Sequence, residues 1–192
     1  MLSFMTRATL DILLLRRGPQ DLPARREVLY VVILAYLVLS APAYVAVIQM
    51  QVHVALMQSV SSLAYLAGFA WAVLALGGRR ERFQQSFMAL VATAAVFNIL
   101  EVGPLISLMP YFLQIQDLML QAQGQPDALD PAVVEAIDVP GFALVMLLLV
   151  YVWRLMVMAH VFHHALEISR GRAMAIALLF PGLIMFLALM VR

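Results

Sequence analysis

Long runs of apolar residues, separated by short polar stretches, dominate the chain. Each of five runs is close to the roughly 20 residues that an α-helix needs to cross a hydrocarbon core about 30 Å thick. They cover residues 29–48, 56–76, 86–106, 141–161 and 173–191. The pattern predicts an all-α fold, a polytopic membrane bundle of about five transmembrane helices. We expect residues 1–192 to form a single integral membrane domain.

The first residues of the chain predict a shorter helix of a different kind. Within residues 1–17, Met5 and Leu13 can share one helical face, while Arg7 and Asp11 lie elsewhere. The two charged residues interrupt the apolar run, which argues against a secretory signal peptide. We therefore expect a short N-terminal helix that lies in the membrane interface.

Glycines and prolines predict where helices end or bend. Gly18-Pro19 is expected to end the first helix, and Asp21 to cap the next one. Pro42 and Pro181-Gly182 lie inside predicted spans, where neighbouring helices can satisfy the carbonyl groups that proline leaves free. We expect kinks at both places.

Residues 110–138 differ from the rest of the chain because they contain five acidic residues and no basic one. We expect an acidic outer loop. Its first part, residues 111–121, can either extend the third span or lie along the membrane surface. Asp130-Pro131 predicts a short helix that ends at Ala136.

Composition supports a membrane location. Sixty-five per cent of the residues are apolar and 12% are charged, whereas a soluble domain is nearer half apolar and a quarter charged. Cysteine is absent, which excludes disulfides, thiolate metal sites and cysteine nucleophiles. All 12 basic residues are arginine, a usage that indicates a GC-rich bacterial genome and hence the bacterial inner membrane.

The arginines predict the orientation of the bundle. They precede the first span, join the second span to the third, and join the fourth to the fifth. With five crossings these segments share one side, which the positive-inside rule makes cytoplasmic. We expect a cytoplasmic N-terminus and a C-terminus outside. The arginines expected to contact anionic lipids are Arg16, Arg17, Arg25, Arg26, Arg79, Arg80 and Arg82.

Two ionisable residues, Glu101 and Arg154, lie inside predicted spans. Because side chains lean toward the N-terminus of their own helix, those on antiparallel spans lean toward each other. We expect an intramembrane ion pair, either direct or bridged by Asn98, Tyr151 or water. It could lock two helices together or belong to a proton or ion path. Arginine does not release protons, which favours the structural interpretation.

Three histidines gather at the cytoplasmic end of the fourth span. His160, His164 and Glu167 have the spacing of metal ligands on one helix face, with His163 beside them. These residues are candidates to hold a metal ion. One of the histidines is alternatively a candidate axial ligand of haem. Alternatively, imidazoles suit the interface and the negative end of the helix dipole. Because no second cluster completes a ligand shell, we expect no cofactor.

Ala64, Gly68 and Ala72 form a row of small residues along the second span. Such rows let helix backbones approach one another closely in lipid. The row therefore predicts a helix-packing surface. It could face another helix of the bundle or a helix of a partner protein.

Three stretches of the chain share their pattern with a known family. They are LLLRRGPQDLP at 13–23, LALGGRRERFQQSFMALVA at 74–92 and YVWRLMVMAHVFHHALEISRGRAMAIAL at 151–178. The pattern resembles the Yip-domain family, bacterial relatives of Rab-interacting multi-pass membrane proteins. The resemblance implies a five-helix bundle with a cytoplasmic N-terminus and supplies no catalytic residues. Eukaryotic relatives carry a long cytosolic N-terminal region that this sequence does not contain, which weakens the expectation of a GTPase partner.

These patterns predict a non-enzymatic scaffold or accessory protein of the inner membrane. It would associate laterally with membrane lipids, with other integral membrane proteins or with itself. The chain has no phosphate-binding loop, nucleophile elbow or zinc-protease motif, and too little soluble surface for nucleic acid.

Two other functions compete with this prediction. The first is a small oligomeric transporter or channel, and the second is an accessory subunit of a redox membrane complex. A transporter requires several polar groups that converge at mid-depth in the membrane. The sequence singles out only Asn98, Glu101 and Arg154 for that role.

Overall fold

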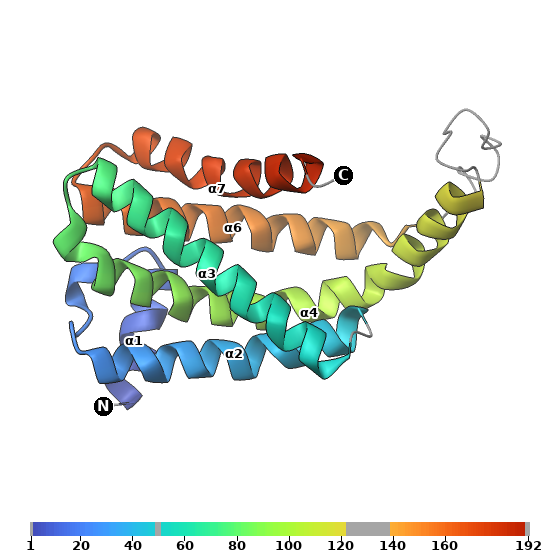
Figure 1. The fold of residues 1–192 in the computed structure, drawn as a ribbon, viewed down its shortest axis with the longest axis horizontal. Helices are drawn as coiled ribbons and strands as arrows, with labels where there is room; N and C mark the ends of the chain where they lie inside the picture. The colour runs from blue at the N-terminus through green and yellow to red at the C-terminus, as the bar shows by residue number, and fades with distance from the viewer. Residues whose placement is uncertain (1, 49–50, 122–138, 191–192) are drawn as a thin grey trace.

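The computed structural model describes residues 2–48, 51–121 and 139–190, and its regular structure there is entirely helical. Lipid offers backbone groups no hydrogen-bond partners, so apolar spans satisfy them internally as helices. The α-helices of this part are α1 (Leu2–Leu13), α2 (Arg26–Ile48), α3 (Val52–Leu76), α4 (Phe83–Gln121), α6 (Gly141–Leu166) and α7 (Arg170–Met190) (Figure 1). The predicted all-α fold is confirmed.

The five long helices run along the molecule, α3 obliquely, and α1 lies across them near one end (Figure 1). α4 is central and packs against α2, α3 and α6, whereas α7 packs mainly against α6. Among the described residues, α3, the segment Arg80–Leu120 and α6 are long and apolar enough to cross a membrane. The count of five spans stays a prediction.

α4 is longer than the predicted third span. It continues through Pro104 and Pro110 to Gln121, so the first part of the expected acidic loop is helical. The extension bends away from the other helices (Figure 1). A bend is expected there because proline has no backbone N–H to donate within the helix. Residues 122–138, with the short helix predicted there, lie outside the described residues.

Two predictions about the N-terminal segment are wrong. α1 ends at Leu13 and not at Gly18-Pro19, because Leu15 has a φ of 59°, in the left-handed region. Asp21 does not cap α2, which begins at Arg26. It belongs to a 3₁₀ turn, Pro19–Asp21. Glycine and proline marked the turn region correctly but not the residue at which each helix ends.

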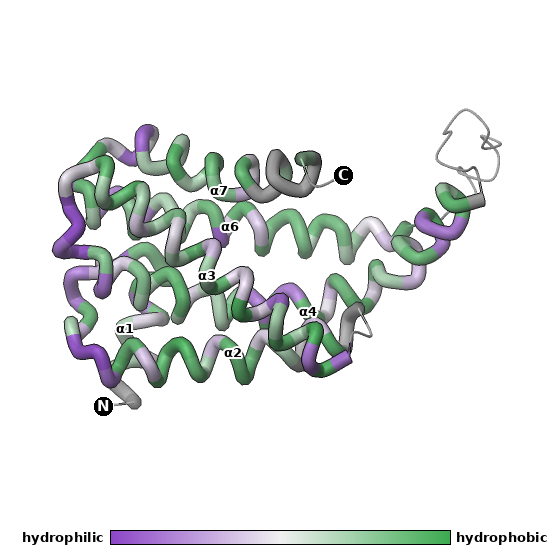
Figure 2. Tube along the Cα trace, in the orientation of Figure 1, coloured by the Kyte–Doolittle hydropathy of each residue, from purple (hydrophilic) through white to green (hydrophobic). Residues whose placement is uncertain are grey.

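Hydrophilic residues gather at one end of the bundle (Figure 2). We call it the arginine-rich end. It holds the connections from α1 to α2, from α3 to α4 and from α6 to α7, the second of which includes the 3₁₀ turn Arg80–Arg82. Its arginines are Arg16, Arg17, Arg25, Arg26, Arg79, Arg80, Arg82, Arg170 and Arg172.

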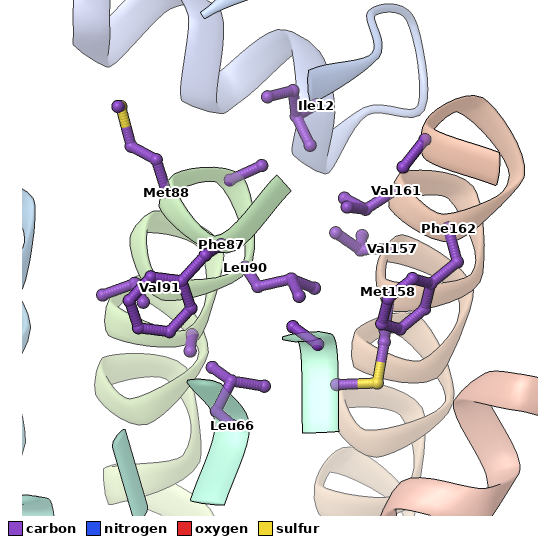
Figure 3. Packing of buried hydrophobic residues seen from close by; sticks show 14 of the residues in the cluster. Ile12, Leu66, Phe87, Met88, Leu90, Val91, Val157, Met158, Val161 and Phe162 are labelled. Atoms are coloured by element: carbon purple, nitrogen blue, oxygen red, sulfur yellow. The ribbon is translucent and has the colours of Figure 1, made fainter. Parts of the chain in front are cut away.

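The main apolar core lies just inside the arginine-rich end. It is formed by the first half of α4 and the second half of α6, with Leu66 of α3 beside them (Figure 3). Ile12 of α1 points into the same core and is only 1% exposed. The N-terminal helix is therefore packed into the bundle through one face, as well as being short and amphipathic.

Candidate functional site

Glu101 of α4 and Arg154 of α6 form a direct ion pair. Arg154 Nη1 donates to Glu101 Oε1 over 2.8 Å. The glutamate side chain is 9% exposed and the arginine side chain 26%, so the guanidinium group is the more accessible of the two. Opposite charges in contact stabilise each other strongly where water is scarce, and either one alone would be costly there.

A cleft of about 680 Å³ opens beside this ion pair, with lining residues from α2, α3, α4, α6 and α7. Four tyrosines line it, namely Tyr36, Tyr44, Tyr65 and Tyr151. Amide and hydroxyl side chains line it as well, namely Gln58, Ser61, Ser62 and Asn98. Polar groups are costly in an apolar medium unless they find partners. Their convergence around one cleft is typical of a site that binds a molecule with a polar part.

Aromatic rings pack beside the cleft on its side toward the arginine-rich end. Phe69 of α3 meets the edges of Phe162 of α6 and Phe180 of α7, with ring centroids 5.9 and 5.2 Å apart. Tyr65 packs on Phe180 at 5.1 Å, and its hydroxyl donates to the Phe180 carbonyl at 3.4 Å. Because α3 runs toward the arginine-rich end, Gln58 lies on the far side of this aromatic cluster. Tyr65 and Phe180 of this cluster also line the cleft, so the aromatic cluster borders it on that side.

Two polar interactions connect α4 to its neighbours around the cleft, in addition to the bond from Tyr65 of α3 to the Phe180 carbonyl of α7. Asn98 Nδ2 donates to Ser40 Oγ over 2.6 Å and joins α4 to α2, and the ion pair joins α4 to α6. The predicted bridge between the charged residues through Asn98 does not form, because the amide is engaged by Ser40. Hydrogen bonds between membrane helices contribute roughly 0.6 kcal/mol each on average. They hold the polar side chains of α4 in a defined orientation.

Several polar groups in the cleft have no hydrogen-bond partner in the described part of the chain. These are the hydroxyls of Tyr44, Tyr151, Ser61 and Ser62 and the amide of Gln58. Only one nitrogen of the Arg154 guanidinium group donates to another described residue, although the group has five N–H donors. The cleft therefore offers more donors than the protein itself uses.

The polar face of α3 was not predicted from the sequence. Gln58, Ser61, Ser62 and Tyr65 follow the i, i+3, i+4, i+7 spacing of one helix face. This spacing is visible in the sequence of an otherwise apolar span. It predicts a polar face but not which neighbouring helices that face meets.

The expected metal ligands do not converge. α6 ends at Leu166, and Glu167 follows in the left-handed region with φ 57°. Glu167 therefore leaves the helix face that it was predicted to share with His160 and His164, so that geometric prediction is wrong. Within the described ranges no group of three His, Cys, Asp or Glu side chains could hold a metal ion.

Glu167 instead binds two arginines of the connection between α3 and α4. Its carboxylate oxygens lie 2.5 Å from Arg79 Nη2 and 2.5 Å from Arg82 Nη2. Arg82 Nη1 also donates to the carbonyls of His164 and Ala165, which caps the C-terminal end of α6. The hydrogen bond from Arg82 and the charge of Arg79 lower the pKa of the Glu167 carboxyl. We call Arg79, Arg82 and Glu167 the Glu167 cluster.

The histidines contact backbone carbonyls of the neighbouring connections. His160 Nε2 lies 2.9 Å from the carbonyl oxygen of Arg17, and His163 Nδ1 bonds that of Ile168. Trp153 lies earlier on α6 than the histidines, and its Nε1 donates to the Leu13 carbonyl over 2.9 Å. These bonds attach the end of α1 and the following turn to α6. Metal or haem binding by the histidines stays a prediction.

The row of small residues on α3 faces away from the bundle. Gly68 is exposed, and a Cβ added there would meet no atom within 4 Å. Ala64 is also exposed, and Ala72 is half-buried. Among the described residues, Gly68 therefore packs against no other helix, contrary to the alternative in which the row faces the bundle. The predicted association with a partner helix stays a prediction.

Comparison with known proteins agrees with the pattern seen in the sequence. A model of the Yip1 domain family matches residues 16–191, nearly the whole chain. The predicted resemblance to this family is therefore confirmed. No curated protein and no solved structure matches the chain.

Proposed function

The chain belongs to the Yip1 domain family of membrane proteins, and we propose that it is a non-enzymatic scaffold or accessory protein that binds an amphiphilic lipid. The polar part of the lipid would enter the cleft beside Glu101 and Arg154. One observation carries the proposal. A cleft of about 680 Å³ presents unpartnered donors in the middle of otherwise apolar helices.

The size and lining of the cleft fit such a ligand. Small-molecule sites typically have volumes of roughly 300–1,000 Å³ and combine apolar walls with a few polar groups. Here Leu105, Leu155 and Pro181 supply apolar wall beside the polar side chains. The polar part of a lipid would accept hydrogen bonds from the donors of the cleft. These bonds would remove the cost of leaving polar groups unpaired in an apolar medium. Its acyl chains would remain among the surrounding lipids.

Filling the cleft tests the proposal. Ser61→Leu and Ser62→Leu put apolar bulk among the polar groups, so the purified protein should lose lipid that the wild type retains. Ser107→Leu is the matched control, because Ser107 is exposed on α4 outside the cleft. Retained lipid is measured by native mass spectrometry after gentle detergent extraction. Equal retention by all three variants would contradict a lipid site in the cleft.

Transport is a second candidate, favoured by the aromatic cluster that packs at one end of a polar cleft. A transporter must let its site be reached from each side of the membrane in turn. Gln58→Cys would then be labelled by impermeant thiol reagents from both sides, in separate experiments. Labelling from one side only, or from neither, would favour a binding protein. The chain suits this test because it has no native cysteine.

The proposal locates the protein in a bacterial inner membrane with its arginine-rich end in the cytoplasm. Exposed arginines of that end, such as Arg25, Arg26 and Arg80, would contact anionic lipid headgroups. Arg80→Cys should then react with impermeant reagents only from the cytoplasmic side, and Gln116→Cys only from outside. Labelling of both from one side would contradict this orientation.

A further inference from the structure

We infer that the cleft selects a net-neutral zwitterionic headgroup, a phosphate joined to an amine as in phosphoethanolamine or phosphocholine lipids. The inference rests on the proposed function and adds the chemistry of the ligand. It comes from three properties of the cleft, namely an accessible guanidinium group, a set of tyrosine rings and a zero net charge.

The guanidinium group of Arg154 provides the contact for phosphate. It uses one nitrogen to hold Glu101 and has further N–H donors that reach no described residue. Arginine binds phosphate through parallel N–H donors, in a planar geometry that matches two phosphate oxygens. Tyr151 lies one turn earlier on α6 and lines the same cleft with an unpartnered hydroxyl. Together the two side chains can donate to several phosphate oxygens.

The tyrosines provide the contact for the amine. Tyr36 and Tyr44 come from α2 and Tyr65 comes from α3. Tyr36, Tyr44 and Tyr151 line the same cleft, so α2 and α6 both contribute tyrosine side chains to it. Ammonium groups bind over the faces of such rings because the ring quadrupole attracts a cation. Glu101, which also lines the cleft, adds a negative charge to the same environment.

The charge balance selects a neutral ligand. Glu101 and Arg154 neutralise each other, and no other charged side chain of the described residues lines the cleft. A ligand with net negative charge would leave one charge uncompensated in a medium of low dielectric constant, where that is costly. A zwitterion satisfies the donors of Arg154 and adds no net charge. Phosphatidylethanolamine should therefore bind better than phosphatidylglycerol.

A competition experiment on the whole protein tests the inference. Wild-type protein is placed in nanodiscs with equal amounts of phosphatidylethanolamine and phosphatidylglycerol, then released for native mass spectrometry. Bound phosphatidylethanolamine should exceed phosphatidylglycerol by about tenfold, the ratio that 1.4 kcal/mol of differential binding produces. The double variant Glu101→Gln/Arg154→Met is neutral and leaves no stranded charge. It should bind the two lipids within about twofold of each other, since it lacks the charged contacts that separate them.

Tyrosine variants test the amine contact separately. Tyr44→Leu should lower the preference for the zwitterionic lipid, whereas Tyr30→Leu, an exposed tyrosine outside the cleft, should leave it unchanged. Preferential retention of phosphatidylglycerol by the wild type would overturn the inference and leave the proposed lipid site standing. Retention of neither lipid would overturn the proposed function itself. If soluble glycerophosphoethanolamine displaced the bound lipid completely, the headgroup chemistry would be supported and a requirement for a lipid overturned.

Discussion

The two halves of α4 and α6 have similar apolar sequences but different surroundings. Toward the arginine-rich end, side chains such as Met88, Val91 and Phe162 are almost completely buried. Toward the opposite end, equally apolar side chains such as Ile99 and Leu148 are exposed on the same helices. Apolarity alone therefore does not tell which part of a membrane helix packs against protein. One half of this molecule supplies most of its packing and the other holds the polar cleft.

Local connections explain why the arginine-rich half is the better packed. α1 inserts Ile12 and Leu13 into the core, and Trp153 holds the end of α1 by a hydrogen bond. The Glu167 cluster ties the connection between α3 and α4 to the end of α6. In the other half the Asn98–Ser40 bond and the Glu101–Arg154 pair join the helices around the cleft. The two halves therefore differ in what holds their helices together, which is apolar packing in one and polar pairs around the cleft in the other.

The two halves should differ most in the free energy of unfolding that is lost when a phenylalanine of each half is replaced by alanine. Phe162→Ala creates a cavity in the core and should lower the free energy of unfolding by about 3 kcal/mol. Phe142→Ala removes a ring that is 78% exposed on α6 and should cost well under about 1 kcal/mol. Unfolding in mixed detergent micelles measures both. Similar losses for the two variants would remove the proposed difference between the halves.

The ion pair should show the next largest effect. Arg154→Met strands a glutamate that is 9% exposed, and Glu101→Gln strands an arginine that is 26% exposed. The first should therefore destabilise the protein more, by about 2 kcal/mol when discounted for the partial exposure of the pair. The double variant should recover part of the loss, because no charge remains unpaired. Melting temperatures in detergent give the comparison. Additive single effects would mean that the two residues do not interact.

The Glu167 cluster should have a smaller effect that depends on pH. Arg82 and Arg79 lower the pKa of Glu167 in the folded protein, so its stabilising contribution is present above the ordinary glutamate pKa. It is lost as the pH falls through the lowered pKa. The melting-temperature difference between wild type and Glu167→Gln should therefore be constant near neutral pH and shrink in acid. Glu81→Gln, in the neighbouring connection, serves as the control. A difference that grows in acid would contradict this account.

The smallest effect on stability is expected at Gly68. Because a Cβ there meets no atom within 4 Å, Gly68→Leu should leave the melting temperature nearly unchanged. If the row of small residues receives a partner helix, the same change should dissociate that complex in a native gel. Ser107→Leu, on the exposed surface of α4, is the matched control. An unchanged complex would show that the row faces lipid only.

Hydropathy along the chain was sufficient to predict the helical class, the approximate ranges of the long helices and the existence of α1. These are local properties, because a run of apolar residues in lipid must form helix wherever it lies. The contact between Glu101 and Arg154 was predictable for a related reason. Antiparallel neighbours direct their side chains toward each other, and few other ionisable groups lie inside the spans.

The cleft was decided only by the tertiary structure. Gln58, Ser61 and Tyr65 form a polar face that is visible in the sequence, yet its meeting with Asn98 and Tyr151 depends on how each helix is rotated about its axis. Lipid and protein interior are both apolar, so hydropathy does not indicate which side of a span faces the bundle. Glu167 also could not be placed from the sequence. Its own left-handed backbone conformation directs its side chain away from the expected histidine face, toward two arginines that are far away in the sequence. Helix rotation and the turns between helices place the functional groups, and both are set by packing between segments far apart in the chain.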